Sequence, residues 1–231
     1  MAYPQYSEQF DFTGNVKDDA NWNVLKNSTA EVTTTGTDYV KMPSESNKAG
    51  ICIHQTAADT LTQCVRIEVR TVAGAGGTVG AILRGAAADG TGDHYECTCR
   101  YSGSAWEFSV EISNGLSFTE LVGTRNSITA PNSGDWFGFS VEGTGASTQF
   151  KFWDFGASDP GEYSTWGAET SLEEGDPVTA IDTGYYTGIR FYTSSPAKLH
   201  EVDTWYGGDT AAAAGGISIP VAMNHYKQMR R

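Results

Sequence analysis

The chain has 231 residues with a formal net charge of −13, 27 glycines, and 12% aromatic but only 19% charged residues. This composition favours strands over helices, and an all-β sandwich or barrel of this length can form a single domain. The excess of acidic residues argues against a protein that binds a phosphate backbone through lysine and arginine, so we expect no nucleic-acid partner.

Residues 1–9 are predicted to be an N-terminal extension ahead of a β-domain at 10–206. This start has neither the basic nor the apolar region of a signal peptide, and no stretch of the chain approaches the roughly 18 apolar residues of a membrane span. We therefore expect a protein made in the cytoplasm without a signal peptide and without a membrane partner.

Along the domain, apolar and polar residues alternate in short runs bounded by turn residues, which is the pattern of half-buried antiparallel strands. The clearest predicted strands cover residues 61–72, 78–84, 94–101, 106–112, 116–122, 135–141, 149–155, 188–192 and 199–206. The pair Asn114-Gly115 lies between two alternating runs and predicts a hairpin. The small residues at 142–148 predict a second hairpin. No fixed-period repeat supports a solenoid or propeller.

Two further features of the domain concern its interior. Cys97 and Cys99 lie two apart in a predicted strand, so their side chains share a face and cannot easily pair with each other. With Cys52 and Cys64 they are expected to be buried free thiols. The long loop 156–177 contains Trp166, which is expected to anchor the loop on the sheet.

The C-terminal residues differ from the domain in composition. Residues 207–216 are small and predict a flexible linker. Residues 217–231 form an apolar and then basic arm that contains no acid. Four apolar side chains are costly to leave in water, so we expect this arm to lie on a neighbouring subunit. A frayed terminus is the alternative. The residues expected to make the contact are Ile217, Ile219, Val221, Met223, Tyr226, Lys227, Arg230 and Arg231.

The segments 141–166 and 187–206 resemble concanavalin-like and laminin-G-like jelly-roll domains. The positions that carry the resemblance are Gly143, Gly145, Trp153, Gly156, Pro160, Trp166, Gly188, Arg190, Asp203 and Trp205. The resemblance implies an all-β antiparallel jelly-roll sandwich, here with an extended C-terminal arm. These residues are structural, and we expect Trp153, in one run with Phe155, to cap the core. Similar domains occur in secreted bacterial proteins and in tailed-phage virion proteins.

No motif predicts catalysis. Glu201 and Asp203 form part of the carboxylate motif of related glucanases, but aromatic residues occupy the place of the further carboxylate that hydrolysis requires. No nucleophile elbow, P-loop or zinc-protease motif occurs, and nothing singles out one of the four histidines for a catalytic triad. We therefore expect a protein that is not an enzyme.

Two kinds of ligand site are considered. Asp89, Asp93 and Glu96 form an oxygen-rich, glycine-punctuated stretch that suggests calcium, with a solvated turn as the alternative. Aromatic residues that could contact a glycan are Trp136, Tyr163, Tyr185 and Tyr186. Tyr185 and Tyr186 point to opposite faces if extended, so one of them is expected to be exposed.

The arm, together with the fold, leads to a first hypothesis of a non-catalytic virion structural protein. This would be a capsid decoration, cement or fibre-associated protein that is located in the virion. Its partners would be other virion proteins or its own subunits in a homo-oligomer. The alternative is a carbohydrate-binding module or lectin for a surface glycan. A glycan hydrolase or lyase ranks last.

Overall fold

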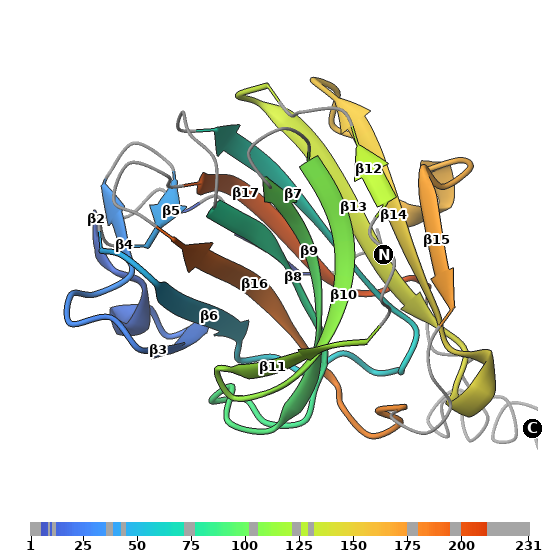
Figure 1. Ribbon diagram of the computed structural model, residues 1–231, viewed down its shortest axis with the longest axis horizontal. Helices are drawn as coiled ribbons and strands as arrows, with labels where there is room; N and C mark the ends of the chain where they lie inside the picture. Colours follow the sequence, from blue (N-terminus) through green and yellow to red (C-terminus); the bar gives the residue numbers. More distant parts are fainter. Residues whose placement is uncertain are drawn as a thin grey trace, which may run out of the picture.

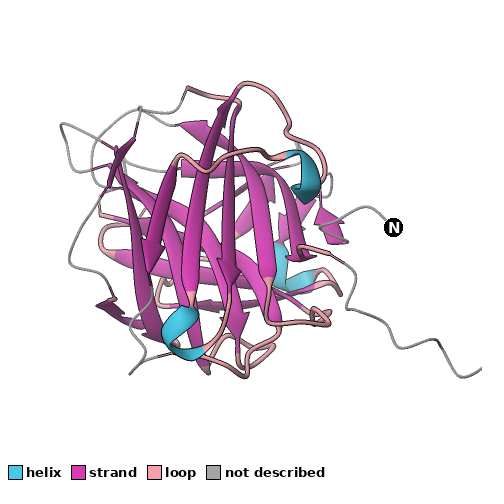
Figure 2. Ribbon diagram, turned by 90° about the vertical axis from the view of Figure 1, so that its right-hand side faces the viewer, coloured by secondary structure: helices cyan, strands magenta, loops and turns pink. Residues whose placement is uncertain are grey.

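Two antiparallel β-sheets lie face to face in the computed structural model and enclose the core between them (Figure 1). The structure describes residues 6–8, 10, 13–35, 39–42, 45–71, 77–101, 106–121, 126–128, 132–174, 180–194 and 200–211. The side view in Figure 2 shows strands throughout, with helix confined to short turns in the connections. The predicted all-β sandwich of the jelly-roll class is therefore confirmed.

Sheet A has nine strands, which follow the order β15-β14-β13-β7-β17-β5-β4-β2, with β1 paired to β17. Their bounds are β1 (Tyr6–Glu8), β2 (Thr13–Asn15), β4 (Thr33–Thr35), β5 (Val40–Lys41), β7 (Gln63–Thr71), β13 (Asp135–Glu142), β14 (Gln149–Gly156), β15 (Ser171–Glu174) and β17 (His200–Asp209). The predicted hairpin around 142–148 is β13–β14, in which Phe139 lies opposite Phe152.

Sheet B has eight strands in the order β11-β10-β9-β8-β16-β6-β3, with β12 paired to β10. Their bounds are β3 (Trp22–Lys26), β6 (Lys48–His54), β8 (Gly77–Gly85), β9 (Asp93–Tyr101), β10 (Trp106–Asn114), β11 (Ser117–Glu120), β12 (Asn126–Ile128) and β16 (Tyr186–Thr193). The hairpin predicted at Asn114-Gly115 is β10–β11. Asn114 pairs with Ser117, so the two loop residues are Gly115 and Leu116.

The core between the sheets is rich in valine and phenylalanine. Phe108 of sheet B stacks on Phe152 of sheet A, with their ring centroids 5.0 Å apart, and both side chains are fully buried. Each large apolar side chain buried in this way contributes about 1.5–3 kcal/mol to folding. Cys97 and Cys99 face the same core, and the four cysteines are buried free thiols, as predicted.

Two expectations from the sequence need correction. Residues 6–8 of the predicted extension pair with β17, and β17 continues through residues 207–209 of the predicted linker. Trp153 does not cap the core. The alternation along β14 sends Phe150 and Phe152 inward and Trp153 outward, where it packs with Cys64 and Trp166.

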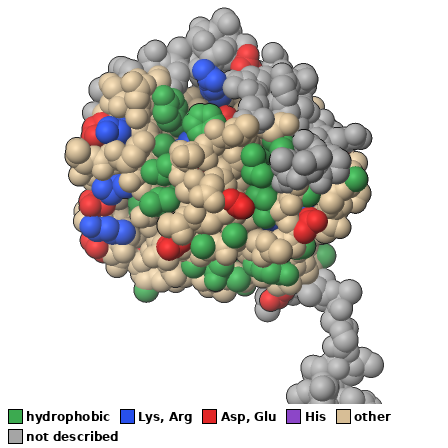
Figure 3. All heavy atoms as spheres, turned by 60° about the horizontal axis from the view of Figure 1, so that its bottom comes forward, with side chains coloured by type: hydrophobic (Ala, Val, Ile, Leu, Met, Phe, Trp, Pro, Cys, Tyr) green, Lys and Arg blue, Asp and Glu red, His purple; other side chains and the backbone are tan. Residues whose placement is uncertain are grey.

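The helical segments are single 3-10 turns named η1 (Val16–Asp18), η2 (Gly145–Ser147) and η3 (Tyr163–Thr165). Among the residues described, no helix has the length and apolar character needed to cross a membrane. Charged side chains on the surface often have neighbours of opposite charge (Figure 3). Lys17 and Lys26, for example, approach Glu31 at 3.0 and 3.5 Å. Such exposed pairs add little to stability, which therefore comes from the core.

Candidate functional site

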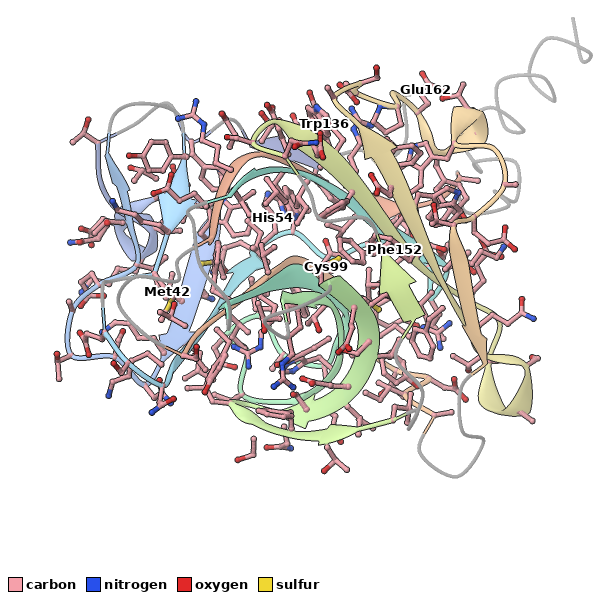
Figure 4. All side chains as sticks on the ribbon, turned by 45° about the horizontal axis from the view of Figure 1, so that its top comes forward. Met42, His54, Cys99, Trp136, Phe152 and Glu162 are labelled. Atoms are coloured by element: carbon pink, nitrogen blue, oxygen red, sulfur yellow. The ribbon has the colours of Figure 1, made fainter. Side chains whose placement is uncertain are left out.

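The face of sheet B that points away from sheet A is concave. The long central strands β9 and β10 bend along their length, and β11 crosses at the lower end of this bend (Figure 1). Figure 4 shows the strands curled around a trough that side chains fill. Because Tyr95, Cys97 and Cys99 face the core, the alternate residues of β9 point into this trough.

The side chains in the trough are polar yet buried. On β9 they are His94, Glu96 and Thr98, and on β10 they are Ser109, Glu111 and Ser113, and each is at most 9% exposed. Side chains on the outward face of a sheet are normally solvated. Here the curl of the sheet removes them from water, so they form a polar interior outside the main core.

A buried ion pair spans the floor of the trough. Nε of Arg190 on β16 donates a hydrogen bond to Oε2 of Glu96 on β9 at 2.5 Å. The guanidinium group reaches across the intervening strand β8 at Gly80, its cross-strand neighbour, which has no side chain to block it. Both partners are fully or nearly fully buried, so each charge depends on the other.

His94 lies beside this pair. Its Nε2 lies 3.3 Å from Oε1 of Glu96, and its Nδ1 lies 2.9 Å from the carbonyl oxygen of Gly92. Burial by itself would raise the pKa of the Glu96 carboxyl, but the charge of Arg190 and the hydrogen bond from His94 lower it to about 2. Glu96 is therefore a carboxylate that holds Arg190 in place.

A pocket of about 140 Å³ opens above this floor. It is lined by Thr78, Thr98, Arg100, Glu111, Phe118, Arg190 and Tyr192. Thr98, Arg190 and Glu111 are nearly buried and form its floor, while Phe118 of β11 and Tyr192 of β16 reach the same pocket from non-adjacent strands. Phe118 is 52% exposed, which is unusual for a phenylalanine on a strand.

A second, more open hollow of about 320 Å³ adjoins the pocket and shares Phe118 with it. Its polar groups include Asp93 and Asn114, which lie on the face of β9 and β10 shared by Tyr95 and Ile112, away from the trough, and are joined by a hydrogen bond of 2.7 Å from Nδ2 of Asn114 to Oδ1 of Asp93. Ser113 also lines it. The Ser113 side chain is 2% exposed, and its Oγ is buried with no hydrogen-bond partner among the described residues.

The structure places the four aromatic residues proposed for glycan contacts elsewhere. Trp136 lies on the outer face of sheet A beneath Arg66, and Tyr163 packs there against Trp166. Tyr185 is 40% exposed, and Tyr186 packs on an apolar cluster of sheet B, so one of this pair is exposed as expected. None of the four lines the pocket of about 140 Å³.

The three residues proposed for calcium do not form one site. Oδ1 of Asp89 accepts hydrogen bonds from the backbone and hydroxyl of Thr91, Asp93 is bound by Asn114, and Glu96 is paired with Arg190. In the part of the chain that the structure describes, no group of three or more His, Cys, Asp or Glu side chains could hold a metal ion.

The structure also gives the carboxylates Glu201 and Asp203 other partners. They lie on sheet A, where Asp203 pairs with Arg70 at 2.9 Å and Glu201 lies 3.8 Å from Lys41. The interaction arm, Ile217–Arg231, lies outside the described residues.

Sequence reasoning missed most of the pocket. Arg190 was identified as a structural position, Glu96 as a calcium ligand and Tyr192 only as one of many aromatic residues, while Glu111 and Phe118 were not identified. The alternation along 94–101 marks one face as polar, but a polar face predicts contact with water. Only the curl of the sheet, which no local pattern encodes, turns that face into a pocket.

Solved structures with the same architecture are legume-lectin-like domains. A legume lectin-like domain from Entamoeba histolytica matches with a TM-score of 0.56 and 11% identity over 87% of this chain and 97% of its own. The carbohydrate recognition domain of Emp47p gives 0.53 and 11% over 91% and 97%. The exoplasmic/lumenal domain of VIP36, in a Ca²⁺- and Man3GlcNAc-bound form, gives 0.50 and 13% over 87% and 90%.

At the level of sequence, no protein-family model matches the chain. No curated protein matches it either. None of the three solved structures described above is a virion protein. They therefore give no support to the hypothesis of a virion structural protein. At these identities the likeness concerns the fold. The chain has the fold of legume-lectin-like carbohydrate recognition domains.

Proposed function

We propose that this protein is a non-catalytic carbohydrate-binding domain that holds a sugar in the pocket of sheet B. This replaces the virion structural role as the leading hypothesis. The observation that carries it is Phe118, a large apolar side chain that is 52% exposed on the wall of a pocket with a polar floor. A sugar ring presents an apolar face and a rim of hydroxyls, and this pocket offers a partner for each.

The size and charge of the pocket favour a neutral ring. A volume of about 140 Å³ lies below the roughly 300–1,000 Å³ of sites that hold drug-sized ligands, so it suits one small ring. The positive charges of Arg100 and Arg190 are balanced by Glu96 below and Glu111 beside them. An acidic sugar would therefore meet no excess of positive charge.

The same geometry supports binding rather than hydrolysis. A retaining glycosidase needs two carboxyl groups about 5 Å apart that both reach the sugar. Glu111 and Glu96 are cross-strand neighbours, but Glu96 is fully buried beneath Arg190 and does not line the pocket. Among the described residues that line the pocket, Glu111 supplies the one carboxylate. The structural neighbours named as carbohydrate recognition domains support the same reading at the level of fold.

The proposal is tested on a glycan array that includes Man3GlcNAc, the glycan bound in the VIP36 structure. We expect the full chain to bind a subset of neutral glycans. Replacing Phe118 with alanine removes the stacking surface, and we expect binding to weaken at least about fivefold, which corresponds to about 1 kcal/mol.

Tyr185 provides the matched control. It is the other large exposed aromatic side chain among the described residues, at 40% exposure, and it does not line the pocket. We expect Tyr185→Ala to bind as the unaltered protein does. The proposal fails if no glycan is bound, or if Tyr185→Ala weakens binding while Phe118→Ala does not.

A further inference from the structure

One end of the trough is filled by apolar side chains. Toward β3 and β6 the polar floor gives way to a cluster that we call the apolar plug. The plug consists of the buried Ile51, Ile53 and Ile82, with Leu25, Leu116 and Tyr186 packed against them. It begins directly beside the binding floor, because Ile51 is the cross-strand partner of Arg190. The pocket and the plug therefore share one trough.

Two turns cover the plug from the solvent side. The turn before β9 lies so close that a Cβ atom on Gly90 would come within 2.8 Å of Ile51. The β10–β11 turn reaches the far edge of the sheet, where a Cβ on Gly115 would lie 3.6 Å from Leu25. A hydrogen bond of 2.9 Å from Nδ2 of Asn23 to the carbonyl of Ala88 fixes the first turn to β3.

This closure limits what the pocket can hold. A glycan chain that crosses the trough needs space on both sides of the bound ring. On the plug side it would meet isoleucine and leucine side chains in contact, and burying hydroxyl groups among them without hydrogen bonds is costly. Phe118, by contrast, is 52% exposed, so a chain attached to the bound ring can leave past it.

From this geometry we infer that the site takes the terminal unit of a glycan, with the rest of the chain leaving past Phe118. The apolar plug excludes internal units. The inference rests on the proposed function, since it names which part of a glycan the same pocket holds.

The first test uses the glycan array again. The glycans that bind are now compared by whether the sugar they have in common is terminal or internal. We expect the bound glycans to share their terminal unit and to differ in their inner units. Adding one further sugar to that terminal unit should weaken binding by at least tenfold. Bound glycans that share an internal unit beneath varied ends would overturn the inference while leaving carbohydrate binding intact. A complete lack of binding would instead remove the proposed function and this inference with it.

The second test opens the plug. Leu25 and Leu116 are only partly buried, so the double variant Leu25→Ala/Leu116→Ala should remain folded, which thermal unfolding verifies. We expect its affinity for the glycan with the added terminal sugar to lie within about threefold of its affinity for the unextended glycan. Leu121→Ala is the control. Leu121 directly follows β11 and is also partly buried, but it packs on the main core and not on the plug.

If the double variant discriminates against the extended glycan as strongly as the unaltered protein does, the plug does not set the specificity. The same conclusion follows if Leu121→Ala admits the extended glycan equally well.

Discussion

Arg190 and Glu96 lie side by side in the polar interior of sheet B, where each compensates the charge of the other. Removing one member of a buried ion pair leaves an uncompensated charge and costs about 3–5 kcal/mol. We expect Arg190→Met to lower the free energy of unfolding by that amount at neutral pH, as measured by urea denaturation, and to abolish glycan binding.

Arg70 serves as the comparison for Arg190. It pairs with Asp203 at 2.9 Å, but its side chain is 40% exposed. Exposed pairs contribute about 1 kcal/mol or less, so Arg70→Met should leave stability and binding nearly unchanged. Equal losses in the two variants would show that the pair in the trough has no special role.

His54 lies in an aromatic stack at the edge of the core. Its ring is stacked between Tyr6 and Trp205, with centroid distances of 5.1 Å to each. Burial lowers the pKa of His54, and the hydrogen bond to Thr56 only partly offsets this effect. The stack holds β1 against β17, so the charge state of one imidazole affects the attachment of an edge strand.

The lowered pKa of His54 makes stability depend on pH. An unfolded histidine binds its proton near pH 6.5, whereas the folded one resists it, so the unfolded state binds more protons at mildly acidic pH. Stability should therefore fall as the pH drops below about 6.5. We expect His54→Phe, which keeps the stack but cannot titrate, to show a flatter decline of the melting temperature between pH 7 and pH 5. Parallel curves for the two proteins would count against this role.

At the level of elements, Trp166 anchors the loop between β14 and β15 on sheet A. Trp166 is 5% exposed and packs on Trp153, Phe155 and Tyr163. It also lies over Gly138 of β13, where a Cβ atom would come within 2.7 Å of its ring. The anchoring role predicted from the sequence is therefore confirmed, and the absence of a side chain at Gly138 explains how the ring fits.

We expect Trp166→Ala to lower the free energy of unfolding by about 3–5 kcal/mol, since large-to-small changes at buried aromatic positions have this cost. Ser164→Ala, an exposed change in the same 3-10 turn, should stay within about 0.5 kcal/mol. Denaturant unfolding measures both. If Trp166→Ala is as mild as Ser164→Ala, the loop does not depend on this side chain.

The elements themselves were largely predictable where the alternation was strong. Strands β7, β8, β9, β13 and β14 match the predicted segments, because each has one face in the core and one outside it. The short strands β2, β4 and β5 were not predicted. They are two or three residues long, and a period of two cannot be recognised over so few positions.

At the level of the whole molecule, the fold could be predicted but the site could not. The sandwich follows from many local patterns that agree with one another. The pocket depends on the curvature of sheet B, which brings Phe118 and Tyr192 to one pocket although they lie on non-adjacent strands. No spacing in the sequence relates these residues, and a buried polar face looks identical to a solvated one until the bend of the strands is known.

The last prediction concerns the C-terminal residues and separates the two leading hypotheses for the whole protein. The pocket is built from residues between Thr78 and Tyr192, and β17 ends at Asp209. A variant that ends at Gly216 should therefore keep its melting temperature and its glycan affinity, while it loses Lys227, Arg230 and Arg231. Glycan-array binding measures the affinity, calorimetry the melting temperature, and light scattering the particle size.

A smaller particle with unchanged binding would give Ile217–Arg231 a role in assembly beside sugar recognition. Lost binding with an intact melting temperature would place recognition in those last residues and contradict the pocket of sheet B as the binding site.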